Sequence, residues 1–259
     1  MYAFAIETAL GAGRILLEKF GKKIGVSKKG EIDLVTEADL ASEKYVINQI
    51  ENRFPQHSIL AEESGSTARA GDMAWKWIID PLDGTTNYAH GYPCFCVTIA
   101  LEHNGELVLG VSYDPTRDEL FAAERRQGAS LNNKRISVSE RTALSDSLLV
   151  TGFPYDIKNR GNLARTFETF LMRSRAVRRD GSAAIDLAYV ACGRFDGFWE
   201  EGLNPWDVAA GILMVREAGG TVTGYDGGEA SIYRPPFVAT NGAIHDEMLA
   251  VLNETNPAS

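Results

Sequence analysis

The sequence has little cysteine, little histidine and fewer basic than acidic residues. It contains three cysteines and four histidines in 259 residues, and its formal net charge is −9. This charge argues against general nucleic-acid binding, because affinity for a phosphate backbone needs a basic field. A site for an anionic ligand would depend on bound cations, since the charge of the protein would repel the ligand.

The few cysteines do not predict a disulfide framework. Cys94 and Cys96 lie two residues apart in a strand-like run, where Cα atoms are about 6.5 Å apart, a poor separation for a disulfide. With Cys192 the count is odd. We therefore expect reduced thiols and a cytoplasmic protein. A Cys-x-Cys zinc site is the alternative, but it has no obvious second pair of ligands.

Long hydrophobic runs are also absent. No stretch approaches the roughly 20 uninterrupted apolar residues of a membrane helix, so we expect no membrane association. At the N-terminus, apolar residues such as Leu10 and Leu16 alternate with Glu7, Arg14 and other charged residues. This pattern predicts an amphipathic helix and not a signal peptide.

The pattern of predicted elements changes near residue 140. Residues 1–140 mix helices and strands and include a hairpin around the turn-rich segment 114–118, whereas residues 141–259 alternate strands and helices. The sequence thus predicts an α+β half joined to an α/β half in one catalytic unit. The predicted helices are about 2–20, 37–53, 160–173, 182–192 and 207–218. Three predicted strands end at 62, 80 and about 100. Further predicted strands cover 106–113, 119–123, 148–151, 176–178, 197–199 and 221–223. The chain closes with the pair of segments 238–240 and 245–252.

The most informative segment is residues 80–87, Asp-Pro-Leu-Asp-Gly-Thr-Thr-Asn. The aromatic and β-branched run 75–79 predicts a strand before it, so Asp80 is expected at a strand's carboxyl end, where open α/β sheets bind ligands. The Asp80 and Asp83 carboxylates can converge there on cations. Hard divalent cations such as Mg²⁺ prefer oxygen ligands of this kind.

The residues after Asp83 suit a phosphate group. Gly84 lets the backbone approach a ligand without a Cβ atom in the way. Thr85 and Thr86 suit the start of a helix, whose unpaired N–H groups attract anions. The segment therefore combines a candidate cation site with a candidate phosphate site.

Local structure alone also explains the acidic residues. Asp83 suits a turn or an N-cap, and Asp80 suits the polar end of a strand. Glu62 fits a solvated loop after a strand, and Asp207 fits a helix N-cap. Residues 36–39 fit a capping box. The residues themselves leave both interpretations open.

Residues 80–87 resemble a signature of the inositol monophosphatase family, the magnesium-dependent, lithium-sensitive phosphomonoesterases. A second signature lies downstream, as Trp-Asp-Val-Ala-Ala-Gly at 206–211 followed by Glu-Ala-Gly-Gly at 217–220. The resemblance covers essentially the whole chain. It implies a layered αβαβα sandwich of the inositol monophosphatase and fructose-1,6-bisphosphatase type, in which both halves contribute to one metal site, and it implies a homodimer.

The resemblance also implies roles for individual residues. Asp80 would bridge two Mg²⁺ ions, and Asp39 would help to hold a third, weakly bound ion near Lys28. The implied metal ligands are Glu62, Asp80, the Leu82 carbonyl, Asp83 and Asp207. The implied catalytic residues are Glu62, Thr85 and Asp39. The implied substrate-binding residues are Asp83, Gly84, Thr85, Gly181, Ser182, Ala183, Glu200 and Asp207.

The expected chemistry follows from the charge of the substrate. A phosphate monoester dianion repels nucleophiles, so the cations that neutralise its oxygens supply the largest effect. Thr85 and Glu62 would orient a water molecule for in-line attack, and no phosphoenzyme is required. No histidine lies in a motif that suggests a nucleophile. The four histidines are His57, His90, His103 and His245.

We expect hydrolysis of inositol 1-phosphate to inositol and phosphate. The alternatives within the superfamily are fructose-1,6-bisphosphatase activity and a broader sugar-phosphate phosphatase. Thr86 and Asn87 are closer to the inositol branch than to nucleotide bisphosphatases. Asp180, Glu201 and the pair 204–205 depart from the animal enzymes, so the preferred alcohol stays open.

A role of a different class also stays open, because some bacterial relatives act in RNA-polymerase antitermination and ribosome maturation. A basic face could serve such a partner. The alternative is that its arginines are solvated or bind loop carboxylates. The arginines concerned are Arg173, Arg175, Arg178 and Arg179.

Overall fold

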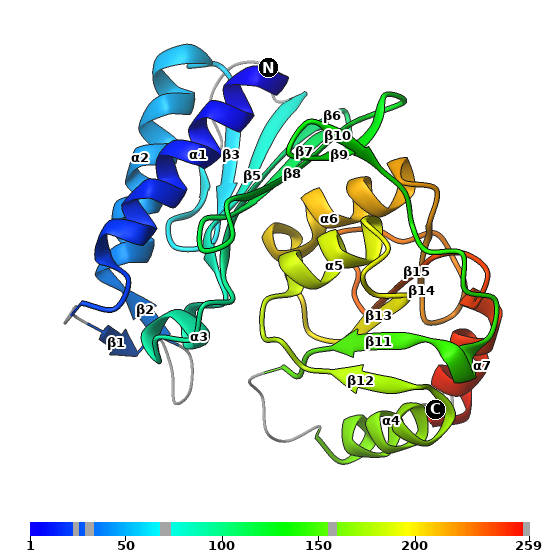
Figure 1. The fold of residues 1–259 in the computed structure, drawn as a ribbon. Helices are drawn as coiled ribbons and strands as arrows, with labels where there is room; N and C mark the ends of the chain where they lie inside the picture. The colour runs from blue at the N-terminus through cyan, green and yellow to red at the C-terminus, as the bar shows by residue number, and fades with distance from the viewer. Residues whose placement is uncertain (23–25, 29–33, 68–73, 155–159, 256–259) are drawn as a thin grey trace.

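Two main β-sheets and three helical layers alternate through the molecule (Figure 1), and the short strands 26–28 and 34–36 form a separate antiparallel pair. The computed structural model describes residues 1–22, 26–28, 34–67, 74–154 and 160–255. In the described part, the order of layers is helix, sheet, helix, sheet, helix, which is the αβαβα sandwich that the sequence predicts. No described helix has the length and apolar character needed to cross a membrane.

The larger sheet has eight strands in the order β10-β9-β8-β7-β6-β5-β3-β4. All neighbours are antiparallel except β3 and β5, which are parallel. Helices α1 and α2 lie side by side against one face of this sheet (Figure 1). The helices are α1 (Tyr2–Lys19) and α2 (Glu37–Arg53). The strands are β3 (Ser58–Ala61), β4 (Gly65–Thr67), β5 (Trp75–Asp83), β6 (Cys96–His103), β7 (Glu106–Asp114), β8 (Glu119–Glu124), β9 (Gly128–Leu131) and β10 (Lys134–Ile136).

The smaller sheet has five strands in the order β12-β11-β13-β15-β14. Strand β11 is parallel to both neighbours, and β15 is antiparallel to both of its own. Helices α5 and α6 fill the space between the sheets, whereas α4 and α7 cover the far face (Figure 1). The strands are β11 (Leu148–Thr151), β12 (Ala176–Arg178), β13 (Gly197–Glu200), β14 (Thr221–Gly224) and β15 (Phe237–Thr240). The helices are α4 (Arg160–Arg173), α5 (Ala183–Ala191), α6 (Pro205–Glu217) and α7 (His245–Thr255).

Strand β5 is buried on both faces because it lies between two helical layers. Successive side chains of a strand point to opposite faces. Trp77 and Ile79 pack in the core under α1 and α2, whereas Ile78 packs in the core around α5 and α6. This explains the almost continuous apolar run before Asp80, which sequence reasoning used to predict the strand.

Helix α6 packs very closely on the larger sheet. A Cβ atom at Gly110 of β7 would lie 2.7 Å from the Cα atom of Ala210, so only glycine fits there. Gly211 faces the neighbouring helix, since a Cβ atom there would lie 2.5 Å from the Cβ atom of Leu187 in α5. These contacts fix the position of the helix that carries Asp207.

Some predicted boundaries differ from the structure. The strand expected to end at Asp80 continues to Asp83, and α6 begins at Pro205 and not at Asp207. Lys28, which the resemblance places near the third ion, is the last residue of β1, and its side chain lies outside the described part. The helix start expected at Thr85 is confirmed by α3 (Thr85–Ala89). The short elements β1 (Val26–Lys28), β2 (Leu34–Thr36) and η1 (Leu144–Asp146), together with β4, β9 and β10, were not predicted.

The two sheets lie on either side of residue 140. The larger sheet ends at Ile136, and the smaller one begins at Leu148. This supports the proposed division into an α+β half and an α/β half, with the helices between the sheets as part of a shared core.

Candidate metal and substrate site

Asp80 and Asp83 lie at the end of β5, where the strand becomes irregular. The pairing with β6 shifts register between these two residues. In a regular strand, residues three apart point to opposite faces, so this irregularity allows both carboxylates to face the same space. The backbone N–H of Leu82 donates to Asp80 Oδ1 at 2.9 Å, and the Ser42 hydroxyl donates to the Pro81 carbonyl at 2.9 Å. These bonds hold the irregular segment in place.

The start of α5 binds the Asp83 carboxylate. The Ser182 hydroxyl and the Ala184 N–H both donate to Asp83 Oδ2, the latter at 2.9 Å. Burial raises the pKa of Asp83 to about 6, although these two hydrogen bonds act in the opposite direction. Asp83 therefore links the larger sheet to the second half of the chain.

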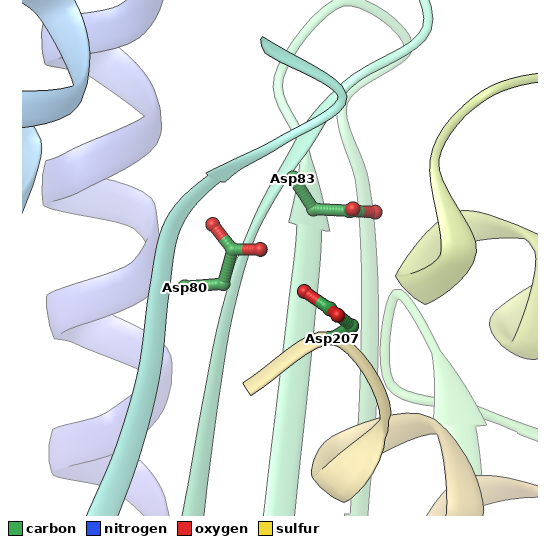
Figure 2. Close-up of side chains that lie close together, drawn as sticks. All are labelled: Asp80, Asp83 and Asp207. Carbon is green, nitrogen blue, oxygen red and sulfur yellow. The ribbon is translucent and has the colours of Figure 1, made fainter. Parts of the chain in front are cut away.

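Asp207 comes from α6, in the second half of the chain. Its Oδ2 accepts a hydrogen bond from the Asn204 N–H at 2.7 Å, as expected for the third residue of a capping box. Oxygen atoms of Asp80, Asp83 and Asp207 all lie within 4.8 Å of one another, and the side chains converge (Figure 2). Capping thus leaves the carboxylate directed at the other two.

The electrostatics of this carboxylate cluster favour a bound cation. Burial, and then the charges of neighbouring carboxylates, raise the pKa of Asp80 and of Asp207 well above the ordinary value. Glu62 contributes to both shifts, and its N–H donates to the Ile79 carbonyl at 3.2 Å, which holds it beside the end of β5. An all-oxygen set of mutually repelling carboxylates fits a hard divalent cation such as Mg²⁺.

Thr85 connects this cluster to Asp39. The Thr85 hydroxyl lies 3.0 Å from the Leu82 carbonyl oxygen and 3.1 Å from Asp39 Oδ1. Asp39 also closes the capping box of α2, because its Oδ2 accepts from the Thr36 N–H at 2.9 Å and from the Thr36 hydroxyl at 2.5 Å. Burial raises the pKa of Asp39 to about 6. The capping interpretation of Asp39 is confirmed. The contact of Asp39 with Thr85 is also compatible with the catalytic interpretation.

One cavity collects nearly all of the predicted site residues. Asp39 is the exception, and it reaches the cavity through Thr85. The predicted residues that line the cavity are Glu62, Asp80, Leu82, Asp83, Gly84, Thr85, Gly181, Ser182, Ala183, Glu200 and Asp207. Thr86, which belongs to the predicted phosphate segment, also lines the cavity. The sequence predicted no catalytic, metal or substrate role for the remaining lining residues, which are Gly152, Phe153, Pro154, Arg179, Gly202, Leu203, Asn204 and Trp206.

Glu200 stands at the end of β13 and depends on a glycine opposite it. A Cβ atom at Gly152 would lie 2.1 Å from Glu200 Oε1, so a larger residue would displace the carboxylate. Burial raises the pKa of Glu200 to about 8, and the charges of Asp207 and Asp83 act in the same direction. Gly152 follows β11 with no recognisable motif, and only the fold shows that it faces Glu200.

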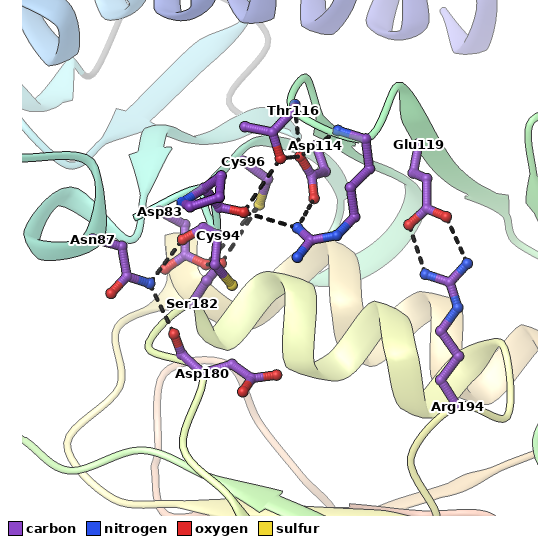
Figure 3. A network of polar contacts seen from close by, with 12 residues as sticks. Asp83, Asn87, Cys94, Cys96, Asp114, Thr116, Glu119, Asp180, Ser182 and Arg194 are labelled. Atoms are coloured by element: carbon purple, nitrogen blue, oxygen red, sulfur yellow. Dashed lines mark hydrogen bonds and ion pairs between the residues drawn. The ribbon is translucent and has the colours of Figure 1, made fainter. Parts of the chain in front are cut away.

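Gly84 and Asn87 shape the opposite wall. Gly84 has φ +92°, and a Cβ atom there would lie 2.8 Å from the Cys94 carbonyl oxygen, so both backbone conformation and space require glycine. Asn87 Nδ2 donates to the Cys94 and Asp180 carbonyl oxygens, each at 2.8 Å (Figure 3). Helix α3, expected to bind phosphate through its N-terminus, has five residues.

The predicted basic face is divided by the structure. Arg173 pairs with Glu254 at 2.8 Å, and Arg175 pairs with Asp146 at 2.7 Å. Arg179 instead lines the cavity. Arg179 lies two residues before Gly181, the first residue of the predicted substrate loop. This proximity in sequence was the signal that could have assigned Arg179 to the site.

Histidines and cysteines lie outside this cavity lining. His57 stacks between aromatic rings and accepts a hydrogen bond from Trp77 Nε1, and His245 bonds to Thr240 and Thr223. All three cysteines are free thiols, and burial raises the pKa of Cys96 well above its ordinary value. The metal-ligand group found among the described residues contains no cysteine, so nothing there supports the zinc alternative.

The fold and the site define a layered α+β protein with a carboxylate centre suited to divalent cations. The chain belongs to the inositol monophosphatase family, whose model matches residues 1–256. It is therefore a hydrolase of the phosphatase type, in a family that is in general magnesium-dependent.

Individual relatives carry two kinds of name. An inositol-1-monophosphatase of Synechocystis is 48% identical over 97% of this chain and 88% of its own length. The Nus factor SuhB of Pseudomonas aeruginosa is 40% identical over 100% of this chain and 98% of its own. The crystal structure of the extragenic suppressor protein suhB of Bartonella henselae has a TM-score of 0.93 and 43% identity, and the match covers 97% of this chain and 98% of that one.

Proposed function

We propose that the protein hydrolyses a phosphate monoester with bound Mg²⁺, and that inositol 1-phosphate is its main substrate. The convergence of Asp80, Asp83 and Asp207 within 4.8 Å carries the proposal, because it unites both signature motifs in one acidic group. The Leu82 carbonyl and Glu62 line the same cavity and would complete the oxygen ligands of two or three ions. Mg²⁺ bound there would neutralise phosphate charge and make water a stronger nucleophile.

The residues around this centre suit distinct parts of the reaction. The Thr85 hydroxyl can donate its proton to Asp39 or to the Leu82 carbonyl, which leaves its oxygen free to accept a hydrogen bond from the attacking water. Glu62 lies beside Asp80, where its carboxylate could orient the same water. Gly84 leaves the space against the backbone open for the phosphate group.

The other end of the cavity would bind the alcohol. Glu200 is buried there and forms no hydrogen bond or ion pair with a described residue. Residues 181–183 line the same cavity. A hydroxylated leaving group can donate to Glu200, whereas a purely apolar one would leave a buried carboxyl group without a partner. This supports a polyol phosphate as substrate.

Phosphate release by the purified protein with Mg²⁺ tests the proposal. Inositol 1-phosphate, fructose 1,6-bisphosphate and adenosine 3′,5′-bisphosphate are compared, each with and without lithium. We expect preferential, lithium-sensitive turnover of inositol 1-phosphate. Preference for either bisphosphate would place the protein in another branch of the superfamily, and no turnover of any substrate would reject the enzymatic proposal.

A partner-binding role is the second candidate, because relatives with 40–43% identity are named Nus factors. The geometry of the predicted basic face gives this role less support, since Arg173 and Arg175 pair with exposed acids and Arg179 lines the cavity. Capture of RNA polymerase or a Nus-type factor, lost on reversing the charges of Arg175 and Arg178, would support it. Family resemblance also leads us to propose a homodimer, which light scattering would test.

A further inference from the structure

The cavity contains one cationic side chain among its described lining residues. Five lining residues carry carboxylates, whereas Arg179 alone carries a fixed positive charge. The carboxylates are Glu62, Asp80, Asp83, Glu200 and Asp207. Bound cations would neutralise the acidic end, but they would leave Glu200 and Arg179 to face the remainder of the ligand.

Arg179 is an exposed residue whose guanidinium lies near the Phe153 ring and forms no ion pair with a described residue. Its Cζ atom lies 6.0 Å from the centre of the Phe153 ring, a distance at which cation and ring attract each other. Its Nη1 atom lies over Gly181, where a Cβ atom would be only 3.0 Å away. The five donors of the guanidinium thus stay available to a ligand.

Arg179 acts on the alcohol end of the cavity. Its positive charge opposes the burial that raises the pKa of Glu200 and of the buried Asp186, whereas the raised pKa values of Asp80 and Asp207 reflect burial first and then neighbouring carboxylates. Glu200 and Arg179 do not form an ion pair with each other, although both line the cavity. The cavity therefore offers a ligand both an acceptor and a multiple donor.

This pair suits adjacent hydroxyl groups better than a second phosphate. A hydroxyl group can donate to Glu200 and accept from Arg179, so neighbouring hydroxyls satisfy both side chains. A second phosphate dianion would gain the one cation of Arg179 but would also meet the Glu200 carboxyl group. The single charge of Arg179 is therefore poorly suited to bind a second dianion at that end.

We propose that Arg179 determines substrate specificity by donating hydrogen bonds to hydroxyl oxygens of the substrate alcohol. This proposal rests on the proposed function. The substrate class is a monophosphate of a polyol with adjacent hydroxyls. Arg179 then contributes chiefly to the recognition of the leaving group, and only weakly to the chemistry at phosphorus.

Arg179→Met tests this proposal, because methionine keeps packing volume against Phe153 and removes every donor. Arg178→Met is the matched control: Arg178 is exposed, bonds to the Val177 carbonyl at 3.2 Å, and does not line the cavity. The values of kcat and KM are measured with inositol 1-phosphate, fructose 1,6-bisphosphate and p-nitrophenyl phosphate, which has no hydroxyl groups. Circular dichroism and thermal unfolding confirm that each variant is folded.

We expect Arg179→Met to lower kcat/KM for inositol 1-phosphate about tenfold, mainly through KM, as lost hydrogen bonds of about 1.4 kcal/mol predict. The loss with p-nitrophenyl phosphate should be several-fold smaller, and Arg178→Met should behave as wild type. Equal losses with both monophosphates would overturn the proposal, because Arg179 would then act on the scissile phosphate. A loss largest with fructose 1,6-bisphosphate would also overturn it, in favour of a second-phosphate site.

The wild-type protein separates this proposal from the proposed function. Mg²⁺-dependent turnover by wild type tests the function, whatever the variant does. If wild type shows no turnover, calorimetric titration with inositol 1-phosphate and Mg²⁺ replaces the kinetics. Weaker binding by Arg179→Met than by Arg178→Met would still support the proposal, and equal binding, or no binding to wild type, would overturn it.

Discussion

The Asn87 side chain joins the two halves of the chain at the rim of the cavity, through a 2.8 Å hydrogen bond from its Nδ2 atom to the Asp180 carbonyl. The same nitrogen donates to the Cys94 carbonyl, also at 2.8 Å. Asn87 therefore donates to the backbone of both halves of the chain (Figure 3). Its place in the octapeptide is explained by this bridge.

Asn87→Ala should loosen the rim. Two carbonyl groups would lose their donor, which we expect to lower the free energy of unfolding by about 1–3 kcal/mol. KM should also increase, because Arg179 and Gly181 adjoin the released Asp180. Urea unfolding and steady-state kinetics measure the two effects. Asn87→Asp places a carboxylate oxygen opposite the two carbonyl oxygens, so it should be at least as damaging as Asn87→Ala. A milder effect of aspartate than of alanine would contradict the bridging role.

Asp83→Asn and Asp207→Asn should abolish metal-dependent activity without unfolding the protein. The asparagine oxygen can still accept from Ser182 and Ala184, or from Asn204, so the local structure is kept. The lost charge should weaken Mg²⁺ binding and lower kcat/KM on the order of 100-fold or more. Calorimetric titration with Mg²⁺ and phosphate release check this. Wild-type activity in either variant would remove that residue from the ligand set.

Gly152→Ala should damage the site through Glu200. The added Cβ atom would lie 2.1 Å from Glu200 Oε1, so the carboxylate must move. We expect KM for inositol 1-phosphate to increase about tenfold, as for the loss of a hydrogen bond to a charged group. The double variant with Glu200→Ala provides the control. It should be no worse than Glu200→Ala alone, and additive losses would show that Gly152 acts elsewhere.

Glu200 should make the metal-free protein less stable as pH rises. Burial raises its pKa from 4.5 to about 8 in the folded state, so between these pH values the folded state binds more protons than the unfolded state. The free energy of unfolding then falls as pH rises through this range. With EDTA present, Glu200→Gln should have a free energy of unfolding roughly 1–3 kcal/mol higher than that of wild type at pH 8, and close to that of wild type at pH 5. A difference in the free energy of unfolding between Glu200→Gln and wild type that is larger at pH 5 than at pH 8 would contradict a raised pKa of Glu200.

Several parts of the fold follow from local sequence. The alternation of apolar and charged residues predicts α1, and the run before Asp80 predicts β5 because both faces of that strand are buried. The capping box at 36–39 also follows from local rules, since the Thr36 and Asp39 side chains lie within one helical turn. The short edge strands β4, β9 and β10 were missed because three or four residues carry too little periodicity.

The site is predictable only as far as its motifs reach. The carboxylates of the two signatures were found, but nothing local to Asp80 indicates that its strand becomes irregular and continues to Asp83. Gly152 and Arg179 were missed for a related reason: their roles depend on contacts with Glu200 and Phe153, which only the packing of the layers creates. Motif matching therefore finds the acidic end more readily than the end that we propose binds the alcohol.

The close approach of Gly110 to Ala210 has a consequence for how the protein tolerates change. This contact fixes the rotation of α6, and Asp207 lies one turn before Ala210. Adjacent positions on a helix differ by about 100°, so a one-residue slip would turn the carboxylate away from Asp80 and Asp83. A methyl group at Gly110 would therefore lower the affinity of the site for cations before it unfolded the protein. Gly110 thus supports cation binding although it does not contact the site.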